Sequence, residues 1–219
     1  RAGRLRKPEA APARAARSTG HVLRMAARSR KTAGRRRKVV FTMTAREKIL
    51  PLLEEKGADC ALFLDEGCNL RIPTPHLVIH GHNMKEGAMF GSLKKYKLKD
   101  ATFYKEHAVF TFNTLYEEAQ YVIYAVADVS IDPGDADYLP FWAYENFTTQ
   151  SQWNAYVGKI RELSRYRTQV DVQPGDRLLT LATCSGADNN RRLLVAARKV
   201  RDGESTLTLK QSVYSTTVK

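Results

Sequence analysis

Short apolar runs separated by polar turns fill most of the chain after residue 60, a pattern that is typical of β-strands. The clearest turns are Asp132-Pro133-Gly134-Asp135 and Gln173-Pro174-Gly175-Asp176. Runs rich in apolar, aromatic and β-branched residues predict strands at 61–64, 77–79, 102–104, 108–112, 121–126, 177–184, 193–200 and 206–214. This succession of short strands favours a mainly β fold, a closed barrel of about eight strands.

Two other stretches have helical features. Apolar residues at three- and four-residue spacing predict a helix in the long connection at about 130–170: Trp153, Tyr156, Val157, Ile160 and Leu163. We expect this stripe to pack on the domain as core rather than to form a binding groove. A second helix is predicted at 44–56, where Thr44 and Glu47 have the spacing of a capping box. The barrel should therefore have an N-terminal helix and a long helix-bearing insertion before the strand at 177–184.

The positive charge of the chain lies almost entirely at its start. The 219 residues include 36 Lys and Arg against 23 Asp and Glu, a formal net charge of +13. Residues 1–38 contain 14 of the basic residues and a single acid, Glu9, so the rest of the chain is neutral. A neutral domain excludes a uniformly basic nucleic-acid-binding globule. We predict an Arg/Ala-rich tail at 1–37, disordered or not native to the domain, and one domain at 38–219.

Cysteine content and hydropathy argue against two further classes of protein. Three cysteines, Cys60, Cys68 and Cys184, are too few and odd in number for a disulfide scaffold, and Cys60 and Cys68 lack the C-x-x-C spacing of a zinc site. The acidic residues lack the pattern of a calcium loop, so we expect no metal and no cofactor. No stretch reaches the roughly 18 consecutive apolar residues of a membrane span, and no signal peptide is readable.

Three polar segments at the ends of predicted strands contain residue types that acyl transfer needs. His80-Gly81-His82-Asn83-Met84 follows the strand at 77–79, Thr180 to Cys184 ends a second strand, and Arg191-Arg192 precedes the strand at 193–200. A cysteine nucleophile needs a base or a cation nearby to be present as thiolate. A guanidinium can donate hydrogen bonds to the oxyanion that develops in the reaction. Each segment alone is a weak signal, but the combination supplies a nucleophile, a base and an oxyanion donor.

These segments resemble the sortases, the cysteine transpeptidases of Gram-positive cell surfaces, and look most like class B. Three stretches carry the resemblance: Ile79 to Leu93 (IHGHNMKEGAMFGSL), Leu179 to Cys184 (LTLATC) and Arg192 to Ala197 (RLLVAA). The helix-bearing insertion is also similar to class B. The resemblance covers about residues 61–200 and implies a sortase-type β-barrel with catalytic function for the domain at 38–219.

The resemblance also implies roles for individual residues. Position in the motifs makes Cys184 the nucleophile, His82 the general acid/base and Arg192 the group that holds the substrate and the oxyanion. Arg191 is the alternative to Arg192, because the two are adjacent at the start of one predicted strand. His80 is the alternative to His82, because it lies two residues earlier and would share its strand face.

Residues beside the nucleophile are expected to touch the substrate: Ala182, Thr183 and Ser185. Two other histidines, His76 and His107, lie outside every motif, and we interpret both as surface residues.

The resemblance further implies a reaction and its partners. The substrate would be a C-terminal sorting signal of a surface protein, similar to Asn-Pro-x-Thr-Asn and cleaved after Thr through a thioacyl-enzyme. The acceptor would be an amine of peptidoglycan precursor or pilin. We expect a monomer without nucleic-acid partners, on the extracellular face of a Gram-positive membrane and held by an anchor not visible in this chain. The alternatives are a protein whose basic tail binds nucleic acid or anionic membrane, and a sortase-fold protein lacking activity.

Overall fold

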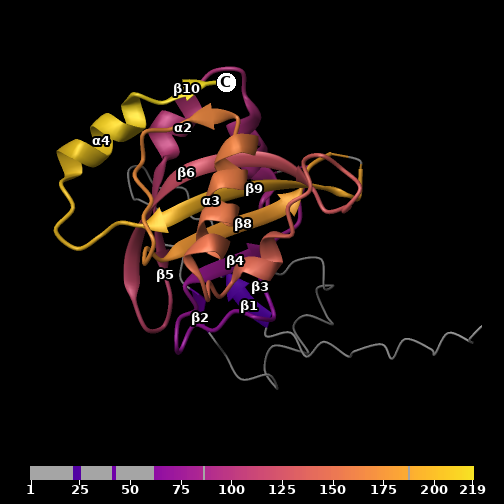
Figure 1. Ribbon diagram of the computed structural model, residues 1–219, viewed down its shortest axis with the longest axis horizontal. Coiled ribbons are helices and arrows are strands. Elements are labelled where there is room, and N and C mark those ends of the chain that lie inside the picture. Colours follow the sequence, from indigo (N-terminus) through magenta and orange to yellow (C-terminus); the bar gives the residue numbers. More distant parts are fainter. Residues whose placement is uncertain (1–21, 26–40, 43–61, 86, 187) are drawn as a thin grey trace, which may run out of the picture.

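The computed structural model describes residues 22–25, 41–42, 62–85, 87–186 and 188–219 (Figure 1). The predicted helix at 44–56, most of the predicted tail at 1–37 and Cys60 lie outside the described residues. The strands are β1 (Val22–Met25), β2 (Phe41–Thr42), β3 (Leu62–Leu64), β4 (His76–His80), β5 (Val109–Asn113), β6 (Glu118–Ser130), β7 (Tyr166–Arg167), β8 (Leu178–Cys184), β9 (Arg191–Lys199) and β10 (Thr217–Val218). The helices are η2 (Gly91–Lys97), α2 (Thr102–His107), η3 (Phe141–Tyr144), α3 (Gln150–Leu163) and α4 (Thr206–Tyr214).

One sheet organises this part of the chain, with the strand order β2-β1-β3-β4-β8-β9-β6-β5. β4 and β8 are parallel, whereas β8, β9, β6 and β5 follow one another antiparallel. The last six strands in this order, β3-β4-β8-β9-β6-β5, form the main sheet, which curves into a half-barrel. Among the described residues β2 and β5 stand at opposite ends of the order and do not pair, so the predicted closed barrel is wrong here. β7 and β10 form a separate two-stranded sheet.

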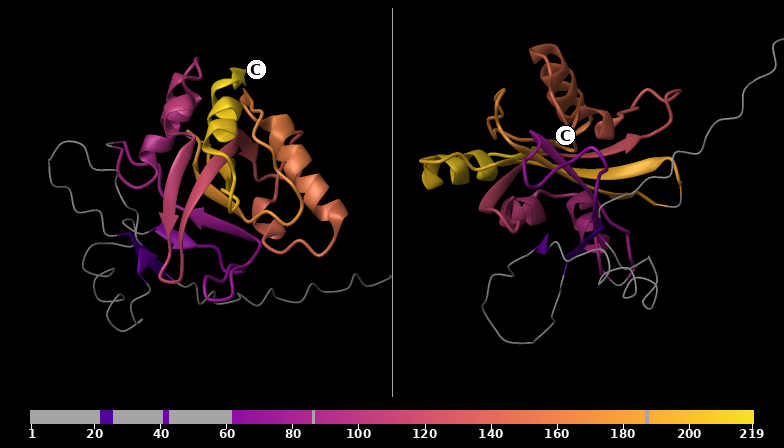
Figure 2. Two further views of the ribbon diagram at one scale, coloured as in Figure 1. Left: turned by 90° about the vertical axis from the view of Figure 1, so that its left-hand side faces the viewer. Right: turned by 90° about the horizontal axis from the view of Figure 1, so that it is seen from below.

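Both faces of the main sheet are covered, which explains why its central strands are nearly continuous apolar runs. α3 crosses one face, and η2 and α2 lie on the other (Figure 2). Side chains of β6, β8 and β9 are accordingly buried along most of their length. With helices on both faces, the fold is mixed α/β rather than the mainly β fold that the sequence predicts.

The predicted helix in the long connection is confirmed as α3. Its apolar stripe faces the sheet, with Trp153, Tyr156, Val157 and Ile160 buried and Leu163 packed at the margin of the core. Thr149 caps its start, since the Thr149 Oγ1 accepts a hydrogen bond from the Gln152 N–H at 3.2 Å. No helix in the described ranges is both long and apolar enough to cross a membrane.

Most predicted strands are confirmed, but one of the errors falls at 102–104. Strands predicted at 61–64, 77–79, 108–112, 121–126, 177–184 and 193–200 are β3, β4, β5, β6, β8 and β9. Residues 102–104 belong instead to α2, where the Asp100 carboxylate accepts a hydrogen bond from the Thr102 N–H at 2.9 Å. The Tyr104 hydroxyl donates to the Ile123 carbonyl at 2.7 Å, so this aromatic residue anchors a helix on the sheet.

The second wrong strand is the one predicted at 206–214, which is α4. The Ser205 Oγ accepts a hydrogen bond from the Thr208 N–H at 3.4 Å and caps the helix. Leu209 and Val213, four residues apart, are both buried, whereas Leu207 is 67% exposed. The alternation of Thr and Leu at the start of this segment therefore imitates a strand, while the buried positions follow the helical period.

His76 is fully buried, which contradicts its interpretation as a surface residue. Its Nδ1 lies 3.1 Å from the Tyr144 carbonyl, and its Nε2 lies 2.8 Å from the Thr180 Oγ1 and 3.3 Å from the Tyr156 hydroxyl. Burial lowers the pKa of His76 from 6.5 to about 4, so the imidazole is a neutral core group at pH 7. His107 is exposed, as expected.

Candidate active site

Cys184 ends β8 and lies directly opposite Arg192 of β9 in the antiparallel register. The Ser185 N–H donates to the Arg191 carbonyl at 3.1 Å, so residues 185 and 191 form a hydrogen-bonded position of the ladder. Cys184 and Arg192 then form a non-hydrogen-bonded pair, the kind whose side chains approach each other most closely. The thiol is free and half-buried. Strand pairing therefore brings a thiol and a guanidinium together at one end of the β8–β9 pair.

His82 reaches the same end because β4 runs parallel to β8 and pairs with it. The Gly81 N–H donates to the Ala182 carbonyl at 3.1 Å, and His82 follows with an exposed side chain. The Asn83 side-chain amide then donates to the Cys184 carbonyl at 3.0 Å. The three segments singled out in the sequence thus meet at one end of β4, β8 and β9.

The two candidate arginines have different partners. The Arg191 guanidinium forms an ion pair with the Asp137 carboxylate at 2.6 Å. The Arg192 Nη1 donates to the carbonyls of Asn189 and Arg191 at 2.6 Å and 3.0 Å, and no carboxylate pairs with Arg192 among the residues that the structure describes. Neighbouring residues of a strand point to opposite faces, so only Arg192 shares a face with Cys184.

His80, the alternative histidine, is engaged in a different cluster. Its Nε2 lies 2.7 Å from the Asp65 Oδ2, and its ring stacks on Phe63 with 4.9 Å between centroids. Burial alone would raise the pKa of Asp65, but hydrogen bonds from His80 and Glu145 outweigh burial and lower the pKa to about 2. Burial, together with the nearby Asp65, raises the pKa of Glu145 to about 7. The His80 imidazole therefore has a carboxylate partner of its own.

The residues beside the nucleophile differ in exposure. Ala182 and Thr183 are buried at 1% and 3% exposure, and Ser185 is half-buried. The Ser185 hydroxyl donates to the Asp128 carboxylate and accepts a hydrogen bond from the Lys97 Nζ at 2.9 Å. Sequence reasoning missed these two partners, which lie 57 and 88 residues from Ser185 and belong to no motif.

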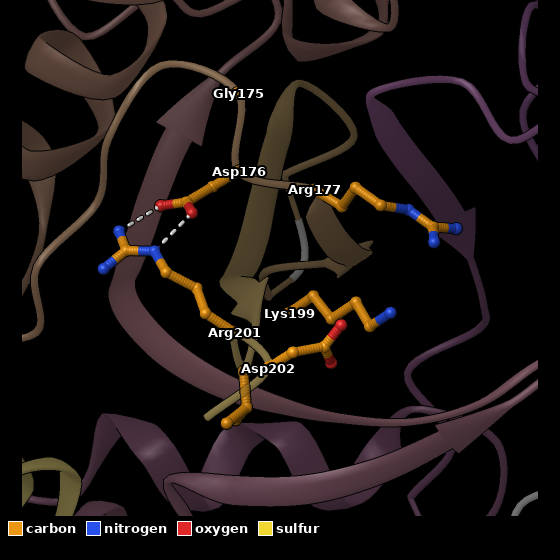
Figure 3. Close-up of a pocket in the computed structure, with 7 residues that line it drawn as sticks. Gly175, Asp176, Arg177, Lys199, Arg201 and Asp202 are labelled. Atoms are coloured by element: carbon orange, nitrogen blue, oxygen red, sulfur yellow. Dashed lines mark hydrogen bonds and ion pairs between the residues drawn. The ribbon is translucent and has the colours of Figure 1, made fainter. Parts of the chain in front are cut away.

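A small cavity of about 160 Å³ lies at the opposite end of the β8–β9 pair (Figure 3). Charged side chains from both strand ends dominate its lining: Asp176, Arg177, Lys199, Arg201 and Asp202. The cavity contains neither a cysteine nor a histidine, so it is separate from the site at Cys184. Within the described residues, no group of three or more His, Cys, Asp or Glu side chains could hold a metal ion.

The family model for the sortase domain matches residues 58–200, a range that includes the whole site around Cys184. The chain belongs to the sortase family. The sortase match ends before α4 and begins after the basic stretch at 1–38, so neither of these segments is part of it.

Within the sortase family the chain is similar to sortase B. Sortase B of Listeria monocytogenes is 30% identical over 131 residues, 59% of this chain and 49% of that protein. A solved sortase B of Bacillus anthracis is 28% identical with a TM-score of 0.53, covering 64% of this chain and 61% of the other. A Staphylococcus aureus sortase B–substrate complex, 21% identical with a TM-score of 0.54 over 64% of this chain and 62% of the other, supports the fold. The chain spans about half the length of the curated relatives it matches.

Proposed function

We propose that this protein is a sortase B-like cysteine transpeptidase, in which Cys184 is the nucleophile, His82 the general acid/base and Arg192 the donor to the substrate carbonyl. The observation that carries the proposal is the direct pairing of Cys184 with Arg192, beside a histidine segment that is hydrogen-bonded to the Cys184 carbonyl. The sortase family match supports the same assignment.

The reaction follows from the chemistry of these three groups. The Cys184 thiolate attacks the scissile carbonyl, and the Arg192 guanidinium stabilises the oxyanion that forms. As the peptide C–N bond breaks, the protonated His82 gives its proton to the leaving amine, and a thioester remains on Cys184. An acceptor amine then transfers a proton to the neutral imidazole and attacks the thioester. The new amide forms and the thiolate is released.

The alternative residues are less suited to these roles. The Arg191 guanidinium is neutralised by Asp137 and belongs to the other face of β9. In Arg192, both hydrogen bonds to backbone carbonyls use Nη1, which leaves donors on Nη2 and Nε for a substrate oxygen. The carboxylate partner of His80 would hold its imidazole away from a substrate, and no such partner holds His82 among the described residues.

The substrate class is inferred from relatives. A Staphylococcus aureus sortase B has been solved as a substrate complex. For this chain we infer a sorting signal similar to Asn-Pro-x-Thr-Asn, cleaved after Thr and transferred to an amine of peptidoglycan precursor or pilin. Ser185, which is half-buried beside Cys184, would line the acyl site, whereas the side chains of Ala182 and Thr183 are buried and less suited to contact a substrate. The enzyme would work as a monomer at the extracellular face of a Gram-positive membrane, with residues 38–219 as its catalytic domain.

A fluorogenic peptide that contains this signal tests the proposal. With hydroxylamine as the acceptor, the folded protein should cleave the peptide after Thr and release the acyl part as a hydroxamate. Cys184→Ala should abolish cleavage. Cys68→Ala, the same substitution at a buried thiol, should retain it, because burial raises the pKa of Cys68 to about 12 and keeps this thiol unreactive. Absence of both cleavage and a thioacyl adduct in a wild-type protein shown to be folded would defeat the proposal.

A further inference from the structure

The Asn83 side chain extends the parallel ladder between the histidine segment and the nucleophile strand. The ladder pairs His80 with Ala182, and the Gly81 N–H donates to the Ala182 carbonyl at 3.1 Å. In a regular parallel ladder the next donor would be the Asn83 backbone N–H, which would meet the Cys184 carbonyl. The chain leaves the strand at this point, and the Asn83 Nδ2 donates to that carbonyl at 3.0 Å.

The turn that follows His82 is compact. The Phe90 N–H donates to the His82 carbonyl at 3.0 Å, and Asn83 forms an isolated antiparallel bridge with Met89. A Cβ at Gly91 would lie 2.1 Å from a backbone oxygen of this turn, so only glycine fits there. The imidazole of His82 makes no hydrogen bond within the described residues. The hydrogen bonds that hold this segment are therefore made by the backbone around His82 and by the Asn83 side chain.

We propose that Asn83 is a positioning residue that couples His82 to Cys184 by holding the histidine turn on the nucleophile's own carbonyl. This inference rests on the proposed function of these two residues. Proton transfer depends on the distance between the imidazole and the reacting atoms, and small misplacements cause large losses of rate. The coupling requires a donor at residue 83, because the group it meets is a carbonyl oxygen.

Replacing the amide should affect catalysis more than substrate binding. Asn83→Ala removes the hydrogen bond and should lower kcat about tenfold, with KM nearly unchanged. Asn83→Asp keeps the shape but sets a carboxylate against the carbonyl, so its loss should be larger. Asn83→Gln retains a donor on a longer side chain and should recover part of kcat. Asn154→Ala makes the same change on the exposed face of α3 and should leave kcat unchanged.

The deciding experiment is a double-mutant cycle with His82→Ala, read out as the rate of Cys184 alkylation by iodoacetamide against pH. A nearby imidazolium favours the thiolate, so removing His82 should shift this profile. Asn83→Ala should shift the profile in the same direction, and it should have no further effect once His82 is absent. An effect of Asn83→Ala that is equal in both backgrounds, or absent from both, would overturn the coupling.

This readout needs no peptide substrate, so it separates the two proposals. A folded wild-type protein that neither cleaves the peptide nor forms a thioacyl adduct, but shows the coupled alkylation profile, contradicts the proposed function and supports the role of Asn83. A protein that cleaves the peptide but in which the effects of Asn83→Ala and His82→Ala are simply additive supports the proposed function and refutes the role of Asn83.

Discussion

Arginine side chains stand at both ends of the β8–β9 strand pair, and the two ends differ in how the positive charge is neutralised. At the Leu178 end, Arg198 is 1% exposed, and its Nη1 lies 2.8 Å from the Glu204 carboxylate. At the Cys184 end, Arg192 is half-exposed and donates to backbone carbonyls. One residue type on one strand thus has two uses. A guanidinium matched by a carboxylate stabilises the fold, and one without a carboxylate can bind an oxyanion.

The basic side chains that line the cavity at the Leu178 end are also paired with carboxylates, as Arg198 is. The Arg201 Nη2 lies 2.7 Å from the Asp176 carboxylate. Figure 3 marks the contact between these two side chains with dashed lines. Arg177 and Lys199 share the Glu117 carboxylate. These cations already pair with acidic side chains. We therefore do not expect the cavity to bind an anion.

The strongest test of this comparison is the removal of Arg198. Arg198→Met should lower the free energy of unfolding by about 3–5 kcal/mol, because it leaves the Glu204 carboxylate without its buried partner. Urea denaturation measures the loss. The double variant Arg198→Met/Glu204→Gln should recover part of the stability, and peptide cleavage per folded molecule should be unchanged. A loss below about 1 kcal/mol, as for an exposed ion pair, would show that the buried pair of Arg198 with Glu204 does not stabilise the fold.

Removal of Arg192 should have the opposite signature. Arg192→Ala should lower kcat for peptide cleavage by about 10²–10³-fold, the usual effect of losing an oxyanion donor. Its free energy of unfolding should stay within about 0.5 kcal/mol of wild type. Steady-state kinetics and urea denaturation of the same preparations provide both numbers.

Arg191→Ala is the matched variant, since it removes the neighbouring guanidinium and the ion pair with Asp137. It should reduce kcat far less than Arg192→Ala. If Arg191→Ala proves the more damaging change, the roles of the two arginines are exchanged.

The meeting of Cys184, Arg192 and the His82 segment could be predicted from the sequence, because each ends or begins a short apolar run. Runs of this kind pair in a sheet, and pairing alone brings their ends together. The contacts of Asn83 and Ser185 could not be predicted in the same way. Their partners lie 101 residues away for Asn83 and 57 and 88 residues away for Ser185, and no local period marks them.

The errors about the fold have a related cause. Local alternation at 206–214 predicts a strand, but a side-chain cap and a buried i, i+4 pair make it α4. His76 appears in no motif, and its partners Tyr156 and Thr180 lie 80 and 104 residues further along the chain. A polar residue that is buried by such distant partners cannot be told from a surface residue by its neighbours in sequence.

His76 provides a pH-dependent test at the structural end of the strand pair, where it is opposite Leu178. Its pKa is lowered by burial from 6.5 to about 4, so between these values the unfolded chain takes up a proton that the folded protein does not. The stabilisation is full above pH 6.5 and is lost as pH falls towards 4. It should amount to about 3 kcal/mol.

Comparison with His76→Gln isolates this effect. The raised pKa of Glu145 acts in the opposite direction, because the folded protein retains a proton there up to about pH 7. That contribution is present in both proteins and should cancel in the difference. The free energies of unfolding of wild type and His76→Gln should be measured at pH 7.5 and at pH 4.5. The difference between the two proteins should be smaller at pH 4.5. A difference that does not depend on pH would contradict a neutral, buried His76.

The smallest expected effect concerns Glu117, whose carboxylate pairs with Arg177 and Lys199 at the partly exposed rim of the cavity. Glu117→Gln should lower the free energy of unfolding by less than about 1 kcal/mol, because solvent screens exposed pairs. The difference from wild type should shrink further in 1 M salt, where the Debye length is about 3 Å. The loss caused by Arg198→Met should persist in the same salt, since its ion pair is largely shielded from solvent. If salt affected both variants equally, burial would not be what separates a structural arginine from its surface neighbours.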